Sequence, residues 1–342
     1  MKSKKTGKKY QFTILLLCVS LIFPFCFSAC GSRATEKYTK TGTYFDTVIS
    51  ITLYDKDKVS CMDTCFEIAA RYEKLFSRTM EDSDVSRINQ ADGEFVTVDP
   101  ETITLIEYGL KYGKLSEGKF DITIGSLSDL WNISDNPGIV PDSQDIEKAR
   151  ETVDYRNLKI DGNQVALQQK GAKLDLGGIA KGYIADRMKD YLKEEGVTSA
   201  TINLGGNVLT IGTKPDGSNY NIAVQKPFAK MNESLAALEI SDQTVVSSGI
   251  YERYFKVGEK IYHHILDPKT GYPVENNLLG VTIICDQSVD GDGLSTSCFS
   301  LGLEKGMELI ESLDNTEAVF ITNDYELHTS SGIGDKIPMK VQ

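Results

Sequence analysis

The chain has 342 residues, of which 40% are hydrophobic and 9% aromatic, and its formal net charge at pH 7 is -12. A chain of this length and apolar content can bury one large core or two lobes that share a face, which argues against disorder over most of it. The acidic balance also argues against nucleic acid as a partner. An anionic ligand would need local compensation by a metal ion and a few well-placed lysines.

The N-terminus has the pattern of a lipoprotein signal peptide. Five lysines lie within the first nine residues, an apolar run covers 12–27, and Phe27-Ser28-Ala29-Cys30 resembles a lipoprotein cleavage box. We expect residues 1–29 to be removed and Cys30 to become the lipidated first residue of the mature protein. Removal of five lysines and no acidic residue would change the net charge from -12 to -17.

The residues after the signal segment are expected to form a tether and one domain. Residues 30–40 are polar and without pattern, which suits a link from lipid to protein, and residues 41–342 would form the domain. The protein would then lie on the outer face of the cytoplasmic membrane. An uncleaved membrane anchor is the alternative, and it gives the domain the same location.

Four cysteines remain if Cys18, Cys26 and Cys30 are used by the signal segment and the lipid. They are too few for a disulfide scaffold in a chain this long. Cys61 and Cys65 share a predicted helix face with apolar residues, so we expect them to be buried as small apolar groups.

Predicted elements follow one another without regular alternation. Helices are expected at 58–76, after an N-cap at Ser83, at 100–115, from 142, from 179, at 292–302 and at 304–313. Strands are expected at 43–54, 158–167 (a hairpin), 173–176, 201–204, 220–225, 244–248, 251–257, 260–266, 280–285 and 317–322. Residues 116–130 are expected to form an irregular loop. The pattern predicts an α+β fold with mixed, largely antiparallel sheets and packed helices.

The segment from Lys173 to Asn207 is the most informative one, because two glycine pairs lie where strand patterning ends. Gly177-Gly178 precedes a predicted helix, and the free N–H groups and positive dipole end of a helix start form an anion site. Lys181 in the first turn opposes the dipole unless an anion pairs with both. Asp175 could cap the helix or hold a cation. The alternative is a tight turn with no ligand.

A second group of residues lies near the C-terminus. Asp292 and Thr296 are four apart, so on a helix both side chains lie on one face. A carboxylate and a hydroxyl at this spacing suit a hard divalent cation, and backbone carbonyls of the glycine loop could complete the set. The alternative is that Asp292 caps the helix and Thr296 bonds back to its own turn.

The third group is the pair His263 and His264 on a predicted strand. Strand neighbours face opposite sides, so at most one of the two points into a given site. A strand histidine can be a hydrogen-bonded structural residue or a general base, and spacing alone leaves both open.

Five ordered motifs together resemble the ApbE family, whose members are FAD:protein FMN transferases and often bacterial lipoproteins. The motifs are Asp175-Leu176-Gly177-Gly178-Ile179-Ala180-Lys181-Gly182, Asn203-Leu204-Gly205-Gly206-Asn207, Ser248-Gly249-Ile250-Tyr251-Glu252-Arg253, His264-Ile265-Leu266-Asp267-Pro268-Lys269-Thr270-Gly271 and Asp292-Gly293-Leu294-Ser295-Thr296. The resemblance covers almost all of residues 41–332. It implies a T-fold-related, two-lobed single unit.

The resemblance also implies the activity, which is magnesium-dependent transfer of the FMN part of FAD to a threonine hydroxyl of another exported protein, with release of AMP. FAD would be the substrate, and the acceptor would carry a threonine flavinylation motif. The implied FAD contacts are Thr41, Phe120, Asp121, Asp175, Lys181 and Ile265. The implied Mg²⁺ ligands are the Gly178 backbone and the Asp292 and Thr296 side chains.

Chemistry at this site is expected to need charge stabilisation more than covalent help, since the reaction cleaves a pyrophosphate. The hypothesis is that a threonine attacks the FMN-side phosphorus while His264 takes its proton. Two alternatives stay open: a hydrolase that sends water to the same phosphorus and yields FMN and AMP, and a non-catalytic FAD-binding lipoprotein.

Overall fold

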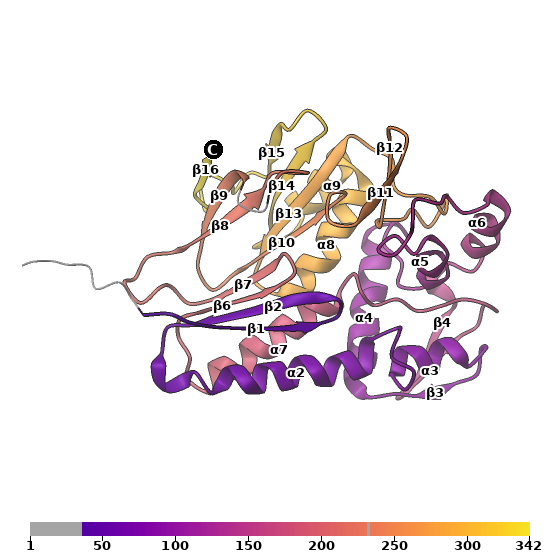
Figure 1. The fold of residues 1–342 in the computed structure, drawn as a ribbon, viewed down its shortest axis with the longest axis horizontal. Coiled ribbons are helices and arrows are strands. Elements are labelled where there is room, and N and C mark those ends of the chain that lie inside the picture. Colours follow the sequence, from indigo (N-terminus) through magenta and orange to yellow (C-terminus); the bar gives the residue numbers. More distant parts are fainter. Residues whose placement is uncertain (1–35, 231–232) are drawn as a thin grey trace, which may run out of the picture. The chain divides into compact units, whose positions relative to one another are not determined.

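The computed structural model describes residues 36–230 and 233–342, shown as a ribbon in Figure 1. The predicted signal peptide, the predicted lipidation site Cys30 and the first part of the tether lie outside the described residues. Across the parts that are described, no helix is both long enough and apolar enough to cross a bilayer.

The central element is an eight-stranded sheet in the order β1-β2-β6-β7-β10-β13-β14-β15, with every neighbouring pair antiparallel. Its strands are β1 (Tyr38–Tyr44), β2 (Thr47–Leu53), β6 (Ala200–Leu204), β7 (Asn207–Ile211), β10 (Thr244–Gly249), β13 (Leu278–Cys285), β14 (Glu317–Thr322) and β15 (Leu327–Thr329). The predicted single strand over 43–54 is wrong. Phe45 and Asp46 take left-handed φ angles of 52° and 53° and turn the chain into a hairpin.

Each face of this sheet is covered by a different layer. Three helices lie on one side: α2 (Cys61–Phe76), α7 (Ala180–Glu194) and α8 (Ser288–Leu301). A small sheet in the order β16-β9-β8 lies on the other, formed by β16 (Met339–Val341), β9 (Ser234–Ile240) and β8 (Tyr220–Gln225). Every residue of β13 and β14 is therefore buried, which explains why both read as continuous apolar runs.

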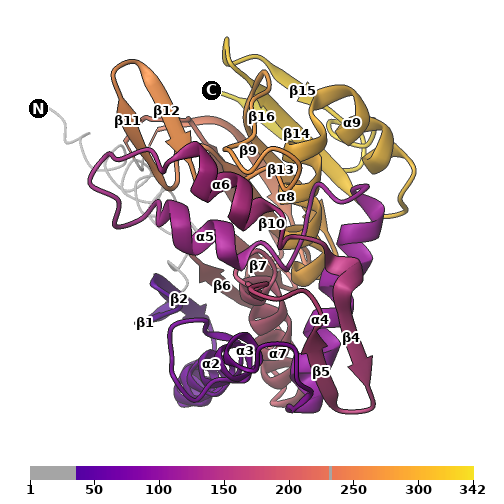
Figure 2. The same cartoon turned by 90° about the vertical axis from the view of Figure 1, so that its right-hand side faces the viewer.

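Most of the remaining elements, among them α3, α4, α5, α6, β4 and β5, form the part that Figure 2 turns toward the reader. The bounds of all the remaining elements are η1 (Lys56–Lys58), α3 (Asp84–Gln90), α4 (Pro100–Leu115), α5 (Gly125–Trp131), α6 (Ser143–Arg150), η2 (Tyr155–Asn157), α9 (Leu303–Glu311) and strands β3 (Val96–Thr97), β4 (Leu158–Asp161), β5 (Gln164–Leu167), β11 (Tyr254–Val257) and β12 (Lys260–His263). The 100–115 helix, the 158–167 hairpin and the Ser83 cap are confirmed, and Ser83 Oγ accepts from Ser86 N at 2.9 Å.

Two further sequence predictions are wrong. The loop expected over 116–130 contains helix α5, because Leu127 and Trp131, one turn apart, are both buried in an apolar cluster with Phe255 of β11. The strand expected over 173–176 is only an isolated bridge between Lys173 and Ile124. In both cases contacts between distant segments decide the local structure.

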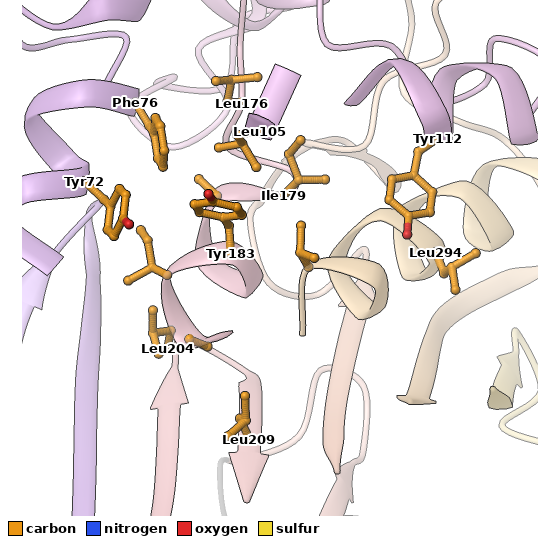
Figure 3. Packing of buried hydrophobic residues seen from close by; sticks show 14 of the residues in the cluster. Tyr72, Phe76, Leu105, Tyr112, Leu176, Ile179, Tyr183, Leu204, Leu209 and Leu294 are labelled. Carbon is orange, nitrogen blue, oxygen red and sulfur yellow. The ribbon is translucent and has the colours of Figure 1, made fainter. Parts of the chain in front are cut away.

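Aromatic rings fix the position of α7 against α2, as Figure 3 shows for Tyr72, Phe76 and Tyr183. The Tyr183 ring lies 5.7 Å from the Tyr72 ring and 5.9 Å from the Phe76 ring, both in edge-to-face geometry. The hydroxyls of Tyr72 and Tyr183 both donate to the carboxylate of Glu101 on α4. One carboxylate thus ties three helices together beside the start of α7.

The start of α7 also packs directly on the start of α8, and Gly182 makes this possible. A Cβ atom at position 182 would lie 2.7 Å from Val289 Cα and closer still to the Ser288 carbonyl. Both neighbours are backbone atoms, which cannot rotate away. The glycine therefore sets how closely the two helices approach.

We predict that Gly182→Ala destabilises the protein by about 1–3 kcal/mol, because the added methyl group overpacks a backbone contact. The sign of the change in stability distinguishes a close contact from an exposed site, because a Gly→Ala change in an exposed helix interior stabilises a protein by about 1 kcal/mol. Denaturant unfolding of both Gly182→Ala and the exposed control Glu194→Ala measures the difference. A Gly182→Ala protein as stable as the wild type would show that the helices do not meet here.

Candidate functional site

The carboxylate of Asp292 is the centre of the site. Asp292 lies in the second turn of α8 and is only 3% exposed. Its Oδ2 accepts a hydrogen bond from Gly182 N at 2.7 Å, and its Oδ1 accepts one from Asn207 Nδ2 at 3.0 Å. The Lys181 ammonium lies 3.9 Å from Oδ2. The central glycine motif and the late Asp/Thr pair, 110 residues apart, are thus brought together.

The capping alternative for Asp292 and Thr296 is wrong. Helix α8 begins four residues before Asp292, at Ser288, and the groups at its start bond to Asp186 of α7, whose oxygens accept from Ser288 N at 2.8 Å and Val289 N at 2.9 Å. The Thr296 hydroxyl bonds to Ser248 Oγ at 3.2 Å instead of its own turn. Burial raises the pKa of the Asp186 carboxyl to about 7, although both N–H donors favour its charged form.

Small and hydroxylated residues let α8 lie close along β10. Ser288 Oγ is 3.1 Å from Thr244 Oγ1 at one end, and Ser295 Oγ is 2.8 Å from Ser248 Oγ at the other. Between them, a Cβ atom at Gly291 would clash with the Val246 side chain. Helix and strand run in the same direction, so the hydroxyl of Thr296 faces the end of β10, where Ser248 lies.

The glycine loop before α7 is open at its backbone. Asp175 does not cap the helix, because its Oδ1 accepts from Gly177 N at 2.9 Å and its Oδ2 lies 3.6 Å from Arg78 Nε. The N-cap residue of α7, Ile179, makes no side-chain cap bond, and Asp292 of α8 accepts from Gly182 N in the first turn instead. Within the described residues the Gly178 carbonyl accepts no hydrogen bond, and the amides of Gly178 and Lys181 donate none. Such groups suit an anion and a cation side by side.

Phe120 and Asp121 reach this loop by packing and by backbone bonds. The Phe120 ring covers Gly178, where an added Cβ would lie 3.1 Å from ring carbon Cε2. Asp121 is 8% exposed, and its oxygens accept from Thr123 N, Thr123 Oγ1 and Tyr155 N at 2.7–2.9 Å. Burial raises the pKa of this carboxyl. The visible role of Asp121 is to hold the loop that carries Phe120, and direct contact with FAD stays a prediction.

The two histidines differ as strand geometry predicts. His263 is 5% exposed and its Nε2 lies 3.0 Å from the Val274 carbonyl, so it is the structural member of the pair. His264 is half-buried, and its Nδ1 lies 3.3 Å from the Arg253 carbonyl. Because a carbonyl only accepts, Nδ1 carries the proton and Nε2 keeps a free lone pair. Burial first, and then the charge of Arg253, lower the His264 pKa to about 3.

Glu252 shares this environment, and no sequence pattern predicts a role for it. Its side chain keeps contact with solvent, yet the surrounding protein raises its pKa to about 7. Desolvation is the main cause, the charges of Lys181 and Arg253 oppose it, and the charge of Asp292 adds to it. The charge of Lys181 also lowers the pKa of His264. Glu252 and His264 are therefore both within reach of the charges at the contact between α7 and α8.

Ile265 and Thr41 have looser connections to the junction. Ile265 is 5% exposed, and its carbonyl accepts from Val274 N at 2.9 Å. Thr41 is exposed on the edge strand β1, and its cross-strand row runs through Ser50 to Asn203 and Val208. Three strand spacings separate Thr41 from Val208, roughly 14 Å. FAD contacts by both residues stay predictions.

Asn207 and Ser248 are site residues whose roles the sequence did not reveal. Asn207 is 1% exposed; its Nδ2 donates to Asp292, and its Oδ1 accepts from Ser288 Oγ at 2.6 Å. Ser248 contacts both Ser295 and Thr296. Both residues lie within two of the five sequence motifs, which is a signal that they matter. The sequence could not show which residues they contact, because those residues come from another part of the chain.

The donor set fits a hard cation such as Mg²⁺. Asp292, Thr296 and the Gly178 carbonyl offer a carboxylate, a hydroxyl and an unbonded carbonyl oxygen, the ligand types that Mg²⁺ takes beside water and phosphate. Among the described residues no cluster of three His, Cys, Asp or Glu side chains could hold a metal, which excludes a zinc-type site there. Gly182 N and Asn207 Nδ2 hold the carboxylate in place, as outer-shell donors do in metal sites.

The four remaining cysteines, Cys61, Cys65, Cys285 and Cys298, are buried and free, as the sequence predicted for Cys61 and Cys65. Burial raises the pKa of the Cys65 and Cys298 thiols to about 12. They are therefore packing residues and not reactive thiols.

Comparison with known proteins gives a consistent result. A model described as the ApbE family matches residues 45–320. A Klebsiella pneumoniae (strain 342) protein named FAD:protein FMN transferase is 38% identical, covering 86% of this chain and 92% of its own length. A protein of the same name from Treponema pallidum (strain Nichols) is 31% identical, with 90% and 91% covered.

Solved structures agree with the sequence comparisons. The ApbE protein from Thermotoga maritima MSB8 superposes with a TM-score of 0.79 at 31% identity, covering 86% of this chain and 97% of its own. The flavin transferase ApbE from Vibrio cholerae gives 0.77 at 27% identity, with 86% and 97% covered. The fold is thus that of flavin transferase structures, and the expected mixed, largely antiparallel architecture is confirmed. The chain belongs to the ApbE family.

We predict that Asn207→Ala destabilises the protein by about 1–3 kcal/mol, because it leaves buried groups of Asp292 and Ser288 without a partner. Asn203→Ala is the matched control: Asn203 stands in the same motif but is exposed, and it should cost less than about 0.5 kcal/mol. Denaturant unfolding compares the two variants. Equal stabilities would mean that Asn207 does not hold the Asp292 carboxylate.

Proposed function

We propose that this chain transfers the FMN part of FAD to a threonine hydroxyl of an exported acceptor protein and releases AMP, with Mg²⁺ bound at the site. Family membership and the names of the relatives support a flavin transferase. The observation that carries the proposal is the hydrogen bond from Gly182 N to Asp292 Oδ2, which sets the start of α7 beside a buried carboxylate. The helix start would bind the diphosphate, and the carboxylate would bind the metal ion.

The chain's own residues would bind the dinucleotide at the start of α7. Its diphosphate would lie against the free amides of Gly178 and Lys181, with the Lys181 ammonium, 28% exposed, pairing with phosphate oxygens. Phe120 and Asp175 would contact the flavin nucleotide from the two sides of the glycine loop. Thr41, Asp121 and Ile265 complete the FAD contacts that we propose.

Mg²⁺, when held by Asp292, Thr296 and the Gly178 carbonyl, would neutralise charge on the phosphates. The chain would do the remaining work by positioning and proton transfer. A bond forms between the threonine oxygen and the FMN-side phosphorus, and the bond from that phosphorus to the bridging oxygen breaks. The bridging oxygen leaves with AMP, and the threonine proton passes to Nε2 of His264.

We also propose that the mature chain is attached by lipid at Cys30 to the outer face of the cytoplasmic membrane. The basic and apolar segments before Cys30 and the cleavage-box pattern support this location. An exported acceptor would then meet the enzyme on the same side of the membrane.

The proposal is tested by incubating the purified protein with FAD, Mg²⁺ and a purified acceptor domain. We expect yellow flavin fluorescence to stay on the acceptor in a denaturing gel, AMP to appear in equal amount, and both to disappear with chelator. Asp292→Asn should abolish the reaction, while the exposed Asp314→Asn should not. Free FMN with an unlabelled acceptor would show a hydrolase, and bound FAD without AMP would show a binding protein.

A second prediction concerns His264. Because its pKa is near 3, the imidazole is neutral across the physiological range, and wild-type turnover should show no acid limb from this group down to about pH 4. His264→Ala should lower kcat at saturating acceptor by a factor of about 10², the lower end of the usual contribution of a general base, because a pKa near 3 makes the imidazole a weak base. His328→Ala on β15, where the histidine is partly exposed, is the control. Turnover close to wild type in His264→Ala would show that another group takes the proton.

A further inference from the structure

Exposed apolar side chains gather around the β11–β12 hairpin, which extends above α6 in Figure 2. Phe228 is 38% exposed, Tyr254 37% and Val257 43%. Together with Lys256 we call these residues the aromatic patch. Ile139, 64% exposed, flanks it, because a Cβ atom at the adjacent Gly138 would lie 3.8 Å from the Lys256 carbonyl.

The patch is an ordered surface and not a scatter of single side chains. The Phe228 and Tyr254 rings are 5.3 Å apart at an interplanar angle of 87°, an edge-to-face pair. The Lys256 ammonium lies 5.9 Å from the centre of each ring. Lys226, at the start of the same loop as Phe228, lies 5.9 Å from the exposed Tyr325 ring. The surface therefore presents aromatic faces with positive charges between them.

The backbone holds Phe228 outward at a conformational cost. Its φ is 60°, in the left-handed region that non-glycine residues seldom adopt. Two hydrogen bonds close the loop around it: Ala229 N donates to the Lys226 carbonyl at 3.2 Å, and Lys226 N donates to the Glu233 carbonyl at 3.0 Å. A strained backbone that presents an aromatic ring to solvent is hard to explain by stability alone.

The patch is continuous with the candidate site through Tyr251. The Phe228 and Tyr251 rings are 6.2 Å apart. The same Tyr251 ring packs on Gly249, where an added Cβ would lie 2.7 Å from ring carbon Cζ. Gly249 follows Ser248, which bonds to Thr296, and Tyr251 precedes Glu252. A molecule seated on the patch thus lies next to the residues proposed to carry the reaction.

We propose that the aromatic patch is the docking surface for the acceptor protein. It would take a segment of the acceptor that carries apolar and acidic side chains next to the threonine. This inference rests on the proposed function, since only a transferase needs a second protein at this position. Positive charges within a chain of net charge -12 favour an acidic partner locally, whereas two copies of the chain repel each other overall.

The occupant must also leave the site accessible to a threonine. A lipid surface or a second copy that covered the patch would extend over Tyr251 and hinder the acceptor's approach. An acceptor segment has the opposite effect, because its binding energy positions the threonine beside Ser248 and His264. A surface with this task would lie outside the proposed FAD site and in contact with its border, which is where the aromatic residues lie.

The test measures FMN transfer against the concentration of a purified acceptor domain that carries a threonine flavinylation motif. The same domain with its threonine replaced by alanine is the blank. For Phe228→Ala, Tyr254→Ala and Lys256→Glu we expect KM for the acceptor to rise about tenfold or more, as for interface hot spots. We expect kcat at saturating acceptor and the affinity for FAD to stay within about twofold of wild type. Phe95→Ala, 48% exposed and outside the patch, should change neither.

Each other outcome decides against the inference. An unchanged acceptor KM in all three variants overturns it, and an equal loss of FAD affinity assigns the patch to the flavin site instead. Sedimentation that shows a dimer dispersed by Phe228→Ala, or binding to anionic vesicles lost in that variant, names a second copy or a membrane as the occupant. If the wild-type protein labels no acceptor, the proposed function itself is wrong. If wild type labels it and the variants do so equally, only the docking surface is wrong.

Discussion

The close approach of α7 and α8 at Gly182 is the constraint on which the rest of the structure depends. Only a residue without a side chain allows the two backbones to meet, and only at that distance can Gly182 N reach Asp292. The same contact places Lys181 beside the carboxylate and lets Asp186 cap α8. A buried carboxylate that receives a backbone N–H and an amide N–H is held in one orientation, which a metal site requires.

Helix α8 buries polar residues where it meets β7 and β10, and this has a structural reason. Hydroxyl groups of Ser288, Ser295 and Thr296 bond to β7 and β10, so the helix is attached to the sheet by directed bonds as well as by packing. Buried polar networks of this kind fix one arrangement because each group has a specific partner. The stability and the geometry of the site are therefore produced by the same contacts.

The environment of the site differs from that of the whole chain. The protein is acidic overall, but Lys181 and Arg253 supply positive charge where we propose that the diphosphate lies. Desolvation by the surrounding protein lowers the pKa of His264 to about 3 and raises that of Glu252 to about 7. The aromatic patch adds a second local exception, with lysines set between exposed rings. Net charge governs long-range repulsion, whereas these local groups govern which ligand binds.

The sequence by itself determined the family, the α+β class and most of the elements, because apolar periodicity, glycine turns and ordered motifs are local features. It identified Asp292, Thr296 and Lys181 but left open whether Asp292 caps a helix, since that depends on where α8 begins. It missed α5 and the hairpin turn at Phe45-Asp46. Only the tertiary structure decided that Asn207 and Ser248 join the site, because their partners lie about 50 or more residues away in the chain, a distance at which no local pattern indicates contact.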